Sequence, residues 1–380
     1  MHVKLKPLSQ QVIVITGASS GIGLATARMA VKAGAAVVLT SRNDAALRRI
    51  CDELNAAGGR THPVVGDVGD PEDVGKIARA AIARFGGFDT WVNDAGVGVY
   101  GELADLDHAD HEQLFRTNYF GVVNGSMEAI KHLRTKRGGG ALINVGSVLS
   151  DVAAPMLGAY SASKHAVKGF TDALRMELRN AKAPVSVTLI KPSSINSPFA
   201  DHARNNMDKP ARVPPPVYTP EVVAEAILYA AQHPVRDITV GGAGRQISLA
   251  GGAAPGVADR VFSALLPNLS KRSGVKSSGD NLYGPGDDGE VRTSAYRGRG
   301  FSVYTQSRQH PALTAAVGGL IVAGVAAYFA RGVLSRTARP AIARAVRPFV
   351  LRAALRKPMG AARFAVRHPR QAAKIAKALR

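Results

Sequence analysis

Cysteine is almost missing from this chain of 380 residues, and its N-terminus lacks a long apolar run. The single cysteine, Cys51, excludes an internal disulfide framework and is consistent with a reducing compartment. The first strongly apolar run, residues 12–15, is too short for the core of a signal peptide. We therefore expect a cytoplasmic protein with an unprocessed N-terminus.

Acidic residues are absent from the last 90 positions. Residues 291–380 hold 18 Lys or Arg and no Asp or Glu, whereas residues 1–290 hold 31 basic and 28 acidic residues. The net charge of +21 is therefore concentrated in a basic C-terminal tail that follows a nearly neutral domain.

Short apolar runs alternate with longer segments of helical pattern. Runs typical of buried strands lie at 12–15, 36–40, 63–68, 88–93, 141–145, 185–190 and 237–240, and helical segments include 71–85, 105–136, 158–182 and 221–232. This alternation predicts an α/β fold with a doubly wound parallel sheet of the Rossmann type. In such sheets, ligands bind beyond the carboxyl ends of the strands.

A glycine-rich turn follows the first strand and precedes a helix. Such a turn presents backbone N–H groups and the positive end of the helix dipole to a phosphate. Its spacing, Gly-x3-Gly-x-Gly, differs from the commoner G-x-G-x-x-G fingerprint. The turn predicts a dinucleotide cradle made of Gly17, Ser19, Ser20, Gly21, Ile22 and Gly23.

Cofactor choice depends on the end of the second strand. A carboxylate there would bind a ribose 2′-hydroxyl and favour NAD, whereas a guanidinium would pair with the 2′-phosphate of NADP. The chain has Arg42 at this point, and Asp44 is expected in the first turn of the next helix. We expect NADP rather than NAD, with a solvated loop charge as the alternative role of Arg42.

Tyr160 and Lys164 lie four residues apart in a predicted helix, so their side chains should share one face. A phenol normally keeps its proton until about pH 10. A nearby ammonium should lower that pKa and make the pair an acid/base unit, although such a pair also occurs by chance on solvated helices.

Taken together, the motifs resemble those of the short-chain dehydrogenase/reductase family over about residues 8–245. The resemblance rests on Thr16-Gly17-x3-Gly21-x-Gly23, Asp67, Asn93-x-Ala95-Gly96, Asn118, Ser147, Tyr160-x3-Lys164 and Pro192. The chain departs from the family pattern at Asp94, where an Asn is usual, and at Ser193 and Ser197, where Gly and Thr are usual.

The resemblance implies a role for each matching residue. Tyr160 would be the catalytic acid/base, Lys164 would bind the nicotinamide ribose, Ser147 would bind the substrate oxygen, and Asn118 would hold a relay water. Cofactor contacts are implied for Asp67 and Val68 at the adenine, for Asn93, and for Ile195 and Ser197 at the nicotinamide. No metal site is expected.

The substrate is expected to be a small alcohol or carbonyl compound. Residues 199–220 correspond to the family's lid, and the apolar pocket candidates Val148, Leu149, Pro155, Met156 and Leu157 weakly favour a lipophilic substrate. Simple packing against the sheet is an equal alternative for them. A non-catalytic NADP-binding sensor or scaffold is the alternative function, and the resemblance suggests a homo-oligomer.

Four regions are expected along the chain. Residues 1–250 form the catalytic domain and 251–310 a short helix (253–266) with a flexible linker; 311–331 form an apolar helix and 332–380 a basic amphipathic tail. Residues 312–330 carry no charge and are long enough to span a bilayer, but spanning would carry the basic tail across the membrane, against the positive-inside tendency. An in-plane helix on anionic lipid, a packed soluble helix and, less favoured, nucleic-acid binding are the alternatives.

Overall fold

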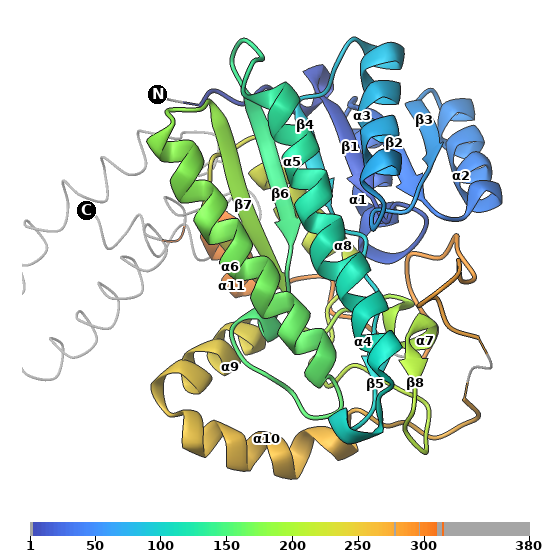
Figure 1. Cartoon of the computed structure of the whole chain (residues 1–380), viewed down its shortest axis with the longest axis vertical. Helices are drawn as coiled ribbons and strands as arrows, with labels where there is room; N and C mark the ends of the chain where they lie inside the picture. Colours follow the sequence, from blue (N-terminus) through green and yellow to red (C-terminus); the bar gives the residue numbers. More distant parts are fainter. Residues whose placement is uncertain (1–2, 277–278, 296, 310–313, 315–380) are drawn as a thin grey trace, which may run out of the picture. The chain divides into compact units, whose positions relative to one another are not determined.

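A parallel seven-stranded sheet forms the centre of the first compact unit, Met1–Gln309. The computed structural model describes residues 3–276, 279–295, 297–309 and 314. Neighbouring strands pair in the order β3-β2-β1-β4-β6-β7-β9, and every pair is parallel (Figure 1). The strands are β1 (Val12–Thr16), β2 (Ala36–Ser41), β3 (Arg60–Val65), β4 (Thr90–Asn93), β6 (Gly140–Val145), β7 (Val185–Pro192) and β9 (Asp237–Val240).

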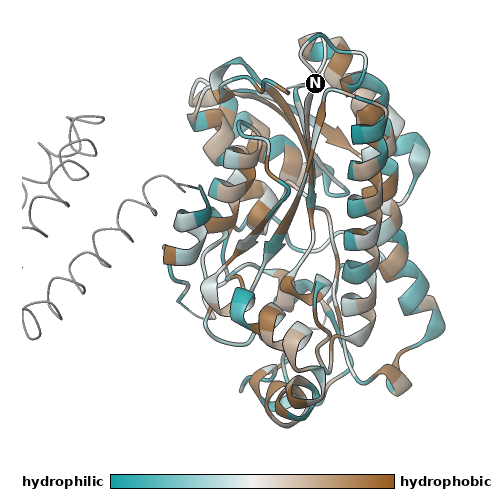
Figure 2. Cartoon of the chain, turned by 90° about the vertical axis from the view of Figure 1, so that its left-hand side faces the viewer, coloured by the Kyte–Doolittle hydropathy of each residue, from teal (hydrophilic) through white to brown (hydrophobic). Residues whose placement is uncertain are grey.

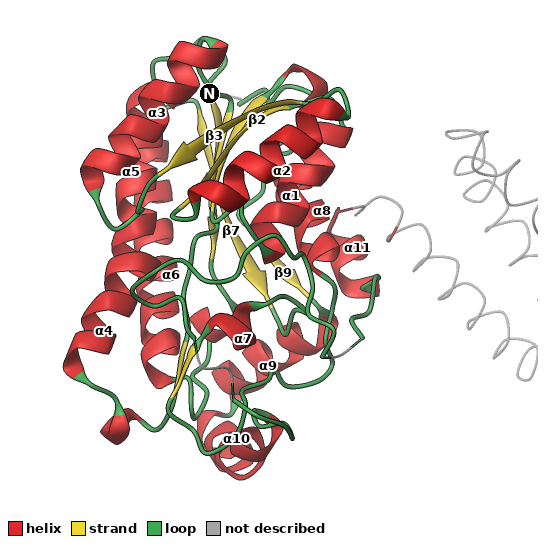
Figure 3. Ribbon diagram, turned by 90° about the vertical axis from the view of Figure 1, so that its right-hand side faces the viewer, coloured by secondary structure: helices red, strands yellow, loops and turns green. Residues whose placement is uncertain are grey.

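Helices cover both faces of the sheet, as Figure 3 shows. On one face α1 (Gly21–Lys32), α2 (Asp44–Ala56) and α8 (Pro220–Ala230) bury apolar side chains against the strands. On the other face α3 (Pro71–Phe85), α5 (Gly121–Leu133) and α6 (Gly158–Asn180) do the same. The strands are apolar on both faces for this reason. The expected doubly wound fold is confirmed.

Local sequence signals fix the ends of several elements. Asp70 caps α3 by accepting a hydrogen bond from the N–H of Glu72, and Gly86 ends that helix in the left-handed region at φ 78°. The long helical region expected over 105–136 is present and consists of α4 (His108–Phe115), a π-helical turn (Arg116–Phe120) and α5. Single π turns within helices are frequent at functional sites.

Further short elements lie around the carboxyl edge of the sheet. They are the parallel pair β5 (Val99–Tyr100) and β8 (Arg204–Asn205), the helix α7 (Phe199–His202), and the 3₁₀ turns Leu103–Asp105 and Val148–Ser150. A further 3₁₀ turn, Leu8–Gln10, precedes β1 at the opposite edge.

The chain after β9 contains the short helix expected over 253–266, here α10 (Pro255–Leu269), but it also contains further helices and hydrogen-bonded coil where a flexible linker was expected. It forms α9 (Gly242–Ala253), α10 and α11 (Val303–Gln309), and the coil before α11 packs back onto the sheet unit through many hydrogen bonds. Helix α10 lies at the bottom of Figure 1, and its large apolar side chains Val257 and Leu265 are exposed. Figure 2 colours the chain by hydropathy and shows many hydrophobic residues at the same end. A glycine- and serine-rich composition is typical of a flexible linker. Coil of the same composition becomes ordered when other parts of the chain donate hydrogen bonds to its carbonyls, as they do here.

Helices of the described residues are all too short or too polar to cross a bilayer. Apart from Thr314, the expected apolar helix at 311–331 and the basic tail at 332–380 lie outside the described residues.

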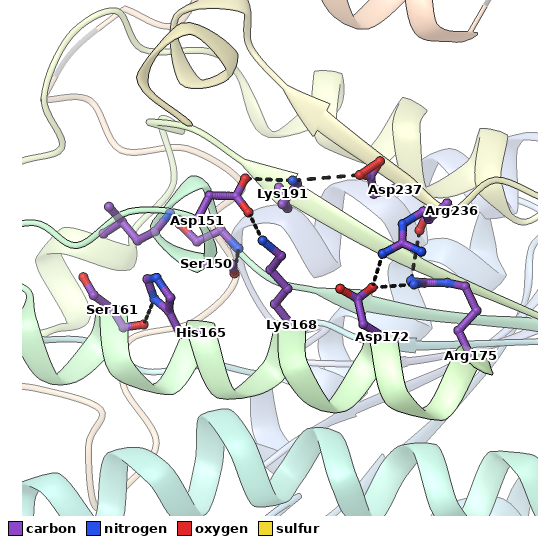
Figure 4. Close-up of polar contacts among 12 residues, drawn as sticks. Ser150, Asp151, Ser161, His165, Lys168, Asp172, Arg175, Lys191, Arg236 and Asp237 are labelled. Carbon is purple, nitrogen blue, oxygen red and sulfur yellow. Dashed lines mark hydrogen bonds and ion pairs between the residues drawn. The ribbon is translucent and has the colours of Figure 1, made fainter. Parts of the chain in front are cut away.

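An ion-pair network joins three elements that carry the site (Figure 4). The Asp151 carboxylate, just after the 3₁₀ turn Val148–Ser150, accepts from Lys168 Nζ of α6 at 2.5 Å and from Lys191 Nζ of β7 at 2.8 Å. Lys191 is 4% exposed, so its charge needs this partner. Burial would raise the pKa of Asp151, but the hydrogen bonds from Lys168 and Lys191 outweigh it and lower that pKa.

We expect Asp151→Asn to lower the free energy of unfolding at pH 7 by about 3 kcal/mol, because it leaves the buried Lys191 ammonium with only the longer ion pair to Asp237 at 3.9 Å. The lowered pKa means that this stabilisation is present above the carboxyl's ordinary value of 3.8 and is lost as pH falls through the folded value. Urea unfolding at pH 7 and below pH 4 measures both effects. Asp172→Asn, which disturbs more exposed pairs with Arg175 and Arg236, is the control and should cost less than about 1 kcal/mol. Equal losses in the two variants would contradict this account.

Candidate active site

The carboxyl ends of the parallel strands open into a cavity of about 470 Å³. Its wall brings together most of the residues that the sequence singles out, although they are far apart in the chain. These are Gly17, Ser19, Ser20, Gly21, Ile22, Arg42, Asp67, Val68, Ser147, Tyr160, Lys164, Ile195 and Ser197. Gly23, Asn93 and Asn118 do not line it.

The glycine-rich turn between β1 and α1 depends on missing side chains. Gly17 has a φ of 70°, and a Cβ there would lie 2.8 Å from the backbone of Ala95. A Cβ on Gly23 would lie 2.2 Å from the carbonyl oxygen of Gly17, so this glycine allows α1 to pack on the turn. The first turn of α1 therefore lines the cavity with backbone N–H groups, a cradle that fits a dinucleotide's phosphates.

Ser147, Tyr160 and Lys164 converge on one wall of the cavity. Ser147 follows β6, and its Oγ accepts from the N–H of Leu149 at 3.0 Å and is hydrogen-bonded to the Tyr160 hydroxyl. Lys164 Nζ donates to the carbonyl oxygen of Val145 at 2.9 Å and lies 5.6 Å from the centroid of the Tyr160 ring. Helix α6 thus points both side chains toward the end of β6, as the i, i+4 spacing predicts.

The pKa of Tyr160 differs from the sequence expectation. Burial raises the pKa of this phenol, the hydrogen bond with Ser147 partly opposes the rise, and the negative charge of Asp94 adds to it. Desolvation is the largest cause, rather than the attraction of Lys164 that we expected to dominate. The raised pKa favours the protonated phenol at neutral pH.

Asp94 and Lys164 both line the cavity, and their charges interact. Burial lowers the pKa of Lys164 to about 8, which the carboxylate of Asp94 partly offsets. Burial also raises the pKa of Asp94 to about 8, against the pull of Lys164 and of the Gly23 N–H. The family pattern places an amide at position 94, so this acid gives the site an extra titrating group close to neutral pH.

Asn118 lies in the π-helical turn and is fully buried. Its Oδ1 accepts from the N–H of Val97 at 2.8 Å, and its Nδ2 donates to the carbonyl of Val97 at 3.0 Å and to Ser163 Oγ at 3.2 Å. These bonds hold the loop after β4 against α6. Its part in a proton relay stays a prediction.

Asn93 is buried between β4 and α5 rather than on the cavity wall. Its Oδ1 accepts from Trp91 Nε1 at 2.8 Å, and its Nδ2 donates to Asn144 Oδ1 at 2.9 Å and to Ser126 Oγ at 3.2 Å. The side chain thus joins neighbouring strands to a helix, and its contact with a cofactor stays a prediction.

Arg42 lies at the end of β2 and lines the cavity. Its guanidinium donates to the backbone carbonyls of Asn281 and Leu282. Among the described residues, no carboxylate forms an ion pair with Arg42, so its positive charge is held in place without being neutralised.

Sequence reasoning missed two parts of the cavity wall. Coil residues Asn281, Pro285, Gly286 and Asp288 lie beside Arg42 and Asp67. The only sequence signal there was Gly284-Pro-Gly-Asp-Asp-Gly289, which we interpreted as linker.

The other missed part comes from α9 and α10, which supply apolar side chains to the opposite end of the cavity. These are Ile247, Val261, Phe262, Leu265, Leu266 and Leu269. Of the apolar candidates predicted from the sequence, Val148, Leu149 and Leu157 line the cavity, whereas Pro155 and Met156 do not.

Known proteins are similar to this chain in sequence. The family model described as short chain dehydrogenase matches residues 11–208. The uncharacterized oxidoreductase YxnA of Bacillus subtilis is 42% identical over 336 residues, which cover 86% of this chain and 92% of that protein. The putative oxidoreductase SadH of Mycobacterium tuberculosis is 34% identical over 193 residues, which cover 51% of this chain and 70% of that protein.

Two solved structures are also similar. An alcohol dehydrogenase from Thermococcus sibiricus, complexed with 5-hydroxy-NADP, shares 25% identity at a TM-score of 0.53 over 60% of this chain and 95% of its own. A short-chain dehydrogenase/reductase from Burkholderia phymatum, in complex with NAD, shares 25% identity at a TM-score of 0.58, and the match covers 72% of this chain and 100% of that one. The chain belongs to the short-chain dehydrogenase family and is an NAD(P)-dependent oxidoreductase.

Proposed function

We propose that the protein interconverts an alcohol and a carbonyl compound with NADP, using Tyr160 as the acid/base. The observation that carries this proposal is the convergence of Ser147, Tyr160 and Lys164 on the cavity that the glycine-rich turn also lines.

The bound dinucleotide supplies or accepts the hydride. During reduction, the hydroxyls of Ser147 and Tyr160 bind the carbonyl oxygen and stabilise the negative charge that develops on it. The Tyr160 hydroxyl then transfers its proton to this oxygen, which becomes the alcohol. Lys164, held by the carbonyl of Val145, stabilises the phenolate that Tyr160 becomes.

Arg42 supports the choice of NADP. The similar solved structures include one complex with an NADP derivative and one with NAD, so the family alone leaves both open. At the end of β2 this chain presents an un-neutralised guanidinium to the cavity. Asp44, the nearest acid along the chain, begins α2 and pairs with Arg48 at 2.8 Å.

The substrate half of the cavity supports a lipophilic alcohol or carbonyl compound. Apolar residues of the 3₁₀ turn after β6, of α9 and of α10 form its wall, with Phe199 and residues 213–216 beside them. Such a wall gives up its contact with water at little cost when it binds an apolar substrate. A panel of carbonyl compounds of increasing chain length should give kcat/KM values that rise with length.

A non-catalytic NADP-binding sensor or scaffold is the alternative function. Asp94 is the observation that favours it, because a carboxyl close to the Tyr160 and Lys164 pair departs from the family pattern. Cofactor binding without turnover across a broad panel of alcohols and carbonyl compounds would support this alternative.

We expect Tyr160→Phe to lower kcat by at least about a hundredfold, because it removes the hydroxyl that donates the proton. NADPH affinity, measured by fluorescence titration, should stay within about twofold because the ring remains. Tyr304→Phe, on α11, is the matched control and should keep full activity. A fully active Tyr160→Phe enzyme would contradict the proposed mechanism.

We expect Arg42→Asp to lower kcat/KM for NADPH by about a hundredfold while that for NADH changes little, because the variant repels a 2′-phosphate. Steady-state kinetics with both cofactors give this ratio. Arg48→Asp on the exposed side of α2 controls for general charge effects. An NADPH-to-NADH ratio that stays the same in Arg42→Asp would refute the role of this arginine.

We also propose, from the sequence, that the basic C-terminal tail associates with anionic membranes and that the protein forms a homo-oligomer. We expect the full chain to sediment with vesicles of anionic lipid, and a chain ending at residue 310 to stay in the supernatant. Equal partitioning of the two chains would contradict the membrane proposal.

A further inference from the structure

Residues 280–292, which we call the strap, cross the cofactor half of the cavity. They are part of the orange coil at the right of Figure 1, beside α7 and close to the N-terminal part of the sheet. Asn281, Pro285, Gly286 and Asp288 of the strap line the same cavity as Gly17, Arg42 and Asp67. The strap is therefore an outer wall of that cavity rather than a filling of it.

The strap pairs with the glycine-rich turn through its backbone. The N–H of Gly289 donates to the carbonyl of Ser19 at 2.9 Å, and the N–H of Gly21 donates to the carbonyl of Glu290 at 3.0 Å. Gly289 has a φ of 117°, and a Cβ there would lie 2.2 Å from Nη2 of Arg49. The positive φ favours glycine at this position, whereas the flexible Arg49 side chain can move away from an added Cβ.

The strap is also bound to the segment after β2. Arg42 donates to two strap carbonyls, Asn43 Nδ2 donates to the carbonyl of Gly286 at 3.2 Å, and Arg49 Nη2 donates to the carbonyl of Asp288 at 3.2 Å. All of these acceptors are neutral carbonyls. The strap thus orients Arg42 without cancelling its charge.

Leu282 anchors the strap beside the catalytic helix. It is 0% exposed and packs in a cluster with Val97, Leu114, Ala159 and the partly buried Tyr160. The carbonyl of Leu282 also accepts from Gln113 Nε2 at 3.1 Å.

The next residue adds a polar anchor. The Tyr283 hydroxyl donates to Asp110 Oδ1 at 2.9 Å, and this carboxylate also accepts from Arg204 Nη1 at 2.7 Å. The strap is thus fastened to α4 and β8 as well as to the glycine-rich turn.

We propose that the strap retains the cofactor: it encloses the adenosine end of the bound dinucleotide against the strand ends and must detach before the cofactor can leave. This rests on the proposed function, in which the cavity takes NADP. It adds that contacts outside the cavity, between the strap and α2, set the rate of cofactor release.

The test is the dissociation rate of NADPH from the full chain, measured by stopped-flow displacement with excess NADP⁺. Leu282→Ala removes the buried anchor and should raise this rate at least about tenfold. Arg49→Ala removes one exposed contact with the strap and should raise it about fivefold. Arg48→Ala, the neighbouring arginine that pairs with Asp44 instead, is the matched control and should stay within about twofold.

Hydrogen exchange of the wild-type protein gives a readout that does not depend on how a variant folds. The amides of Gly21 and Gly289 should exchange slowly in the free protein and more slowly with saturating NADPH. Free exchange of both amides would overturn the strap's role, as would unchanged dissociation rates in Leu282→Ala and Arg49→Ala. Tighter NADPH binding in these variants would also overturn it, because the strap would then obstruct the site. Failure of the wild-type protein to bind NADPH or NADH would overturn the proposed function as well.

Discussion

The buried ammonium of Lys164 is the interaction on which the arrangement of the site depends. This side chain is 4% exposed, and a charge removed from water to that extent needs fixed polar partners. The carbonyl at the end of β6 supplies one, and the carboxyl of Asp94 after β4, whose pKa burial raises to about 8, supplies an opposing charge when it is ionised. The positions of β4, β6 and α6 are thus coupled through one charged group, and the geometry around Tyr160 follows from them.

A second buried cation holds the same helix further along. Lys191, on β7, shares Asp151 with Lys168 of α6, and Asp151 follows the turn that begins after Ser147. Helix α6 is therefore held at two points along its length, by Lys164 at the cavity wall and by Lys168 at Asp151. Ser147 and Tyr160 come from different elements, and this second point limits how far those elements can move apart.

The sequence was most informative where function depends on local pattern. The glycine-rich turn, the apolar strands and the Tyr160 and Lys164 spacing each follow from rules that act over a few residues, and the structure places these residues on one cavity wall. The bonds of Asn118 and Asn93 depend on partners 21 and 51 residues away, Val97 and Asn144. The position of the strap could not be predicted from the sequence, because its hydrogen bonds use backbone carbonyls, which every residue type possesses. The pKa of Tyr160 was misjudged because burial depth is a property of the fold.

The strap and α10 have a consequence for how activities are transferred between relatives. The family model ends at residue 208, whereas the cavity wall continues to Asp288. The proposed catalytic residues lie in the shared part, whereas the strap and α10, which we propose help to enclose the two ends of the ligands, lie beyond it. Substrate range and cofactor residence time can therefore diverge by changes in one contiguous C-terminal segment while the catalytic residues stay the same. Relatives matched over only half of this chain inform the reaction far more than they inform its ligands.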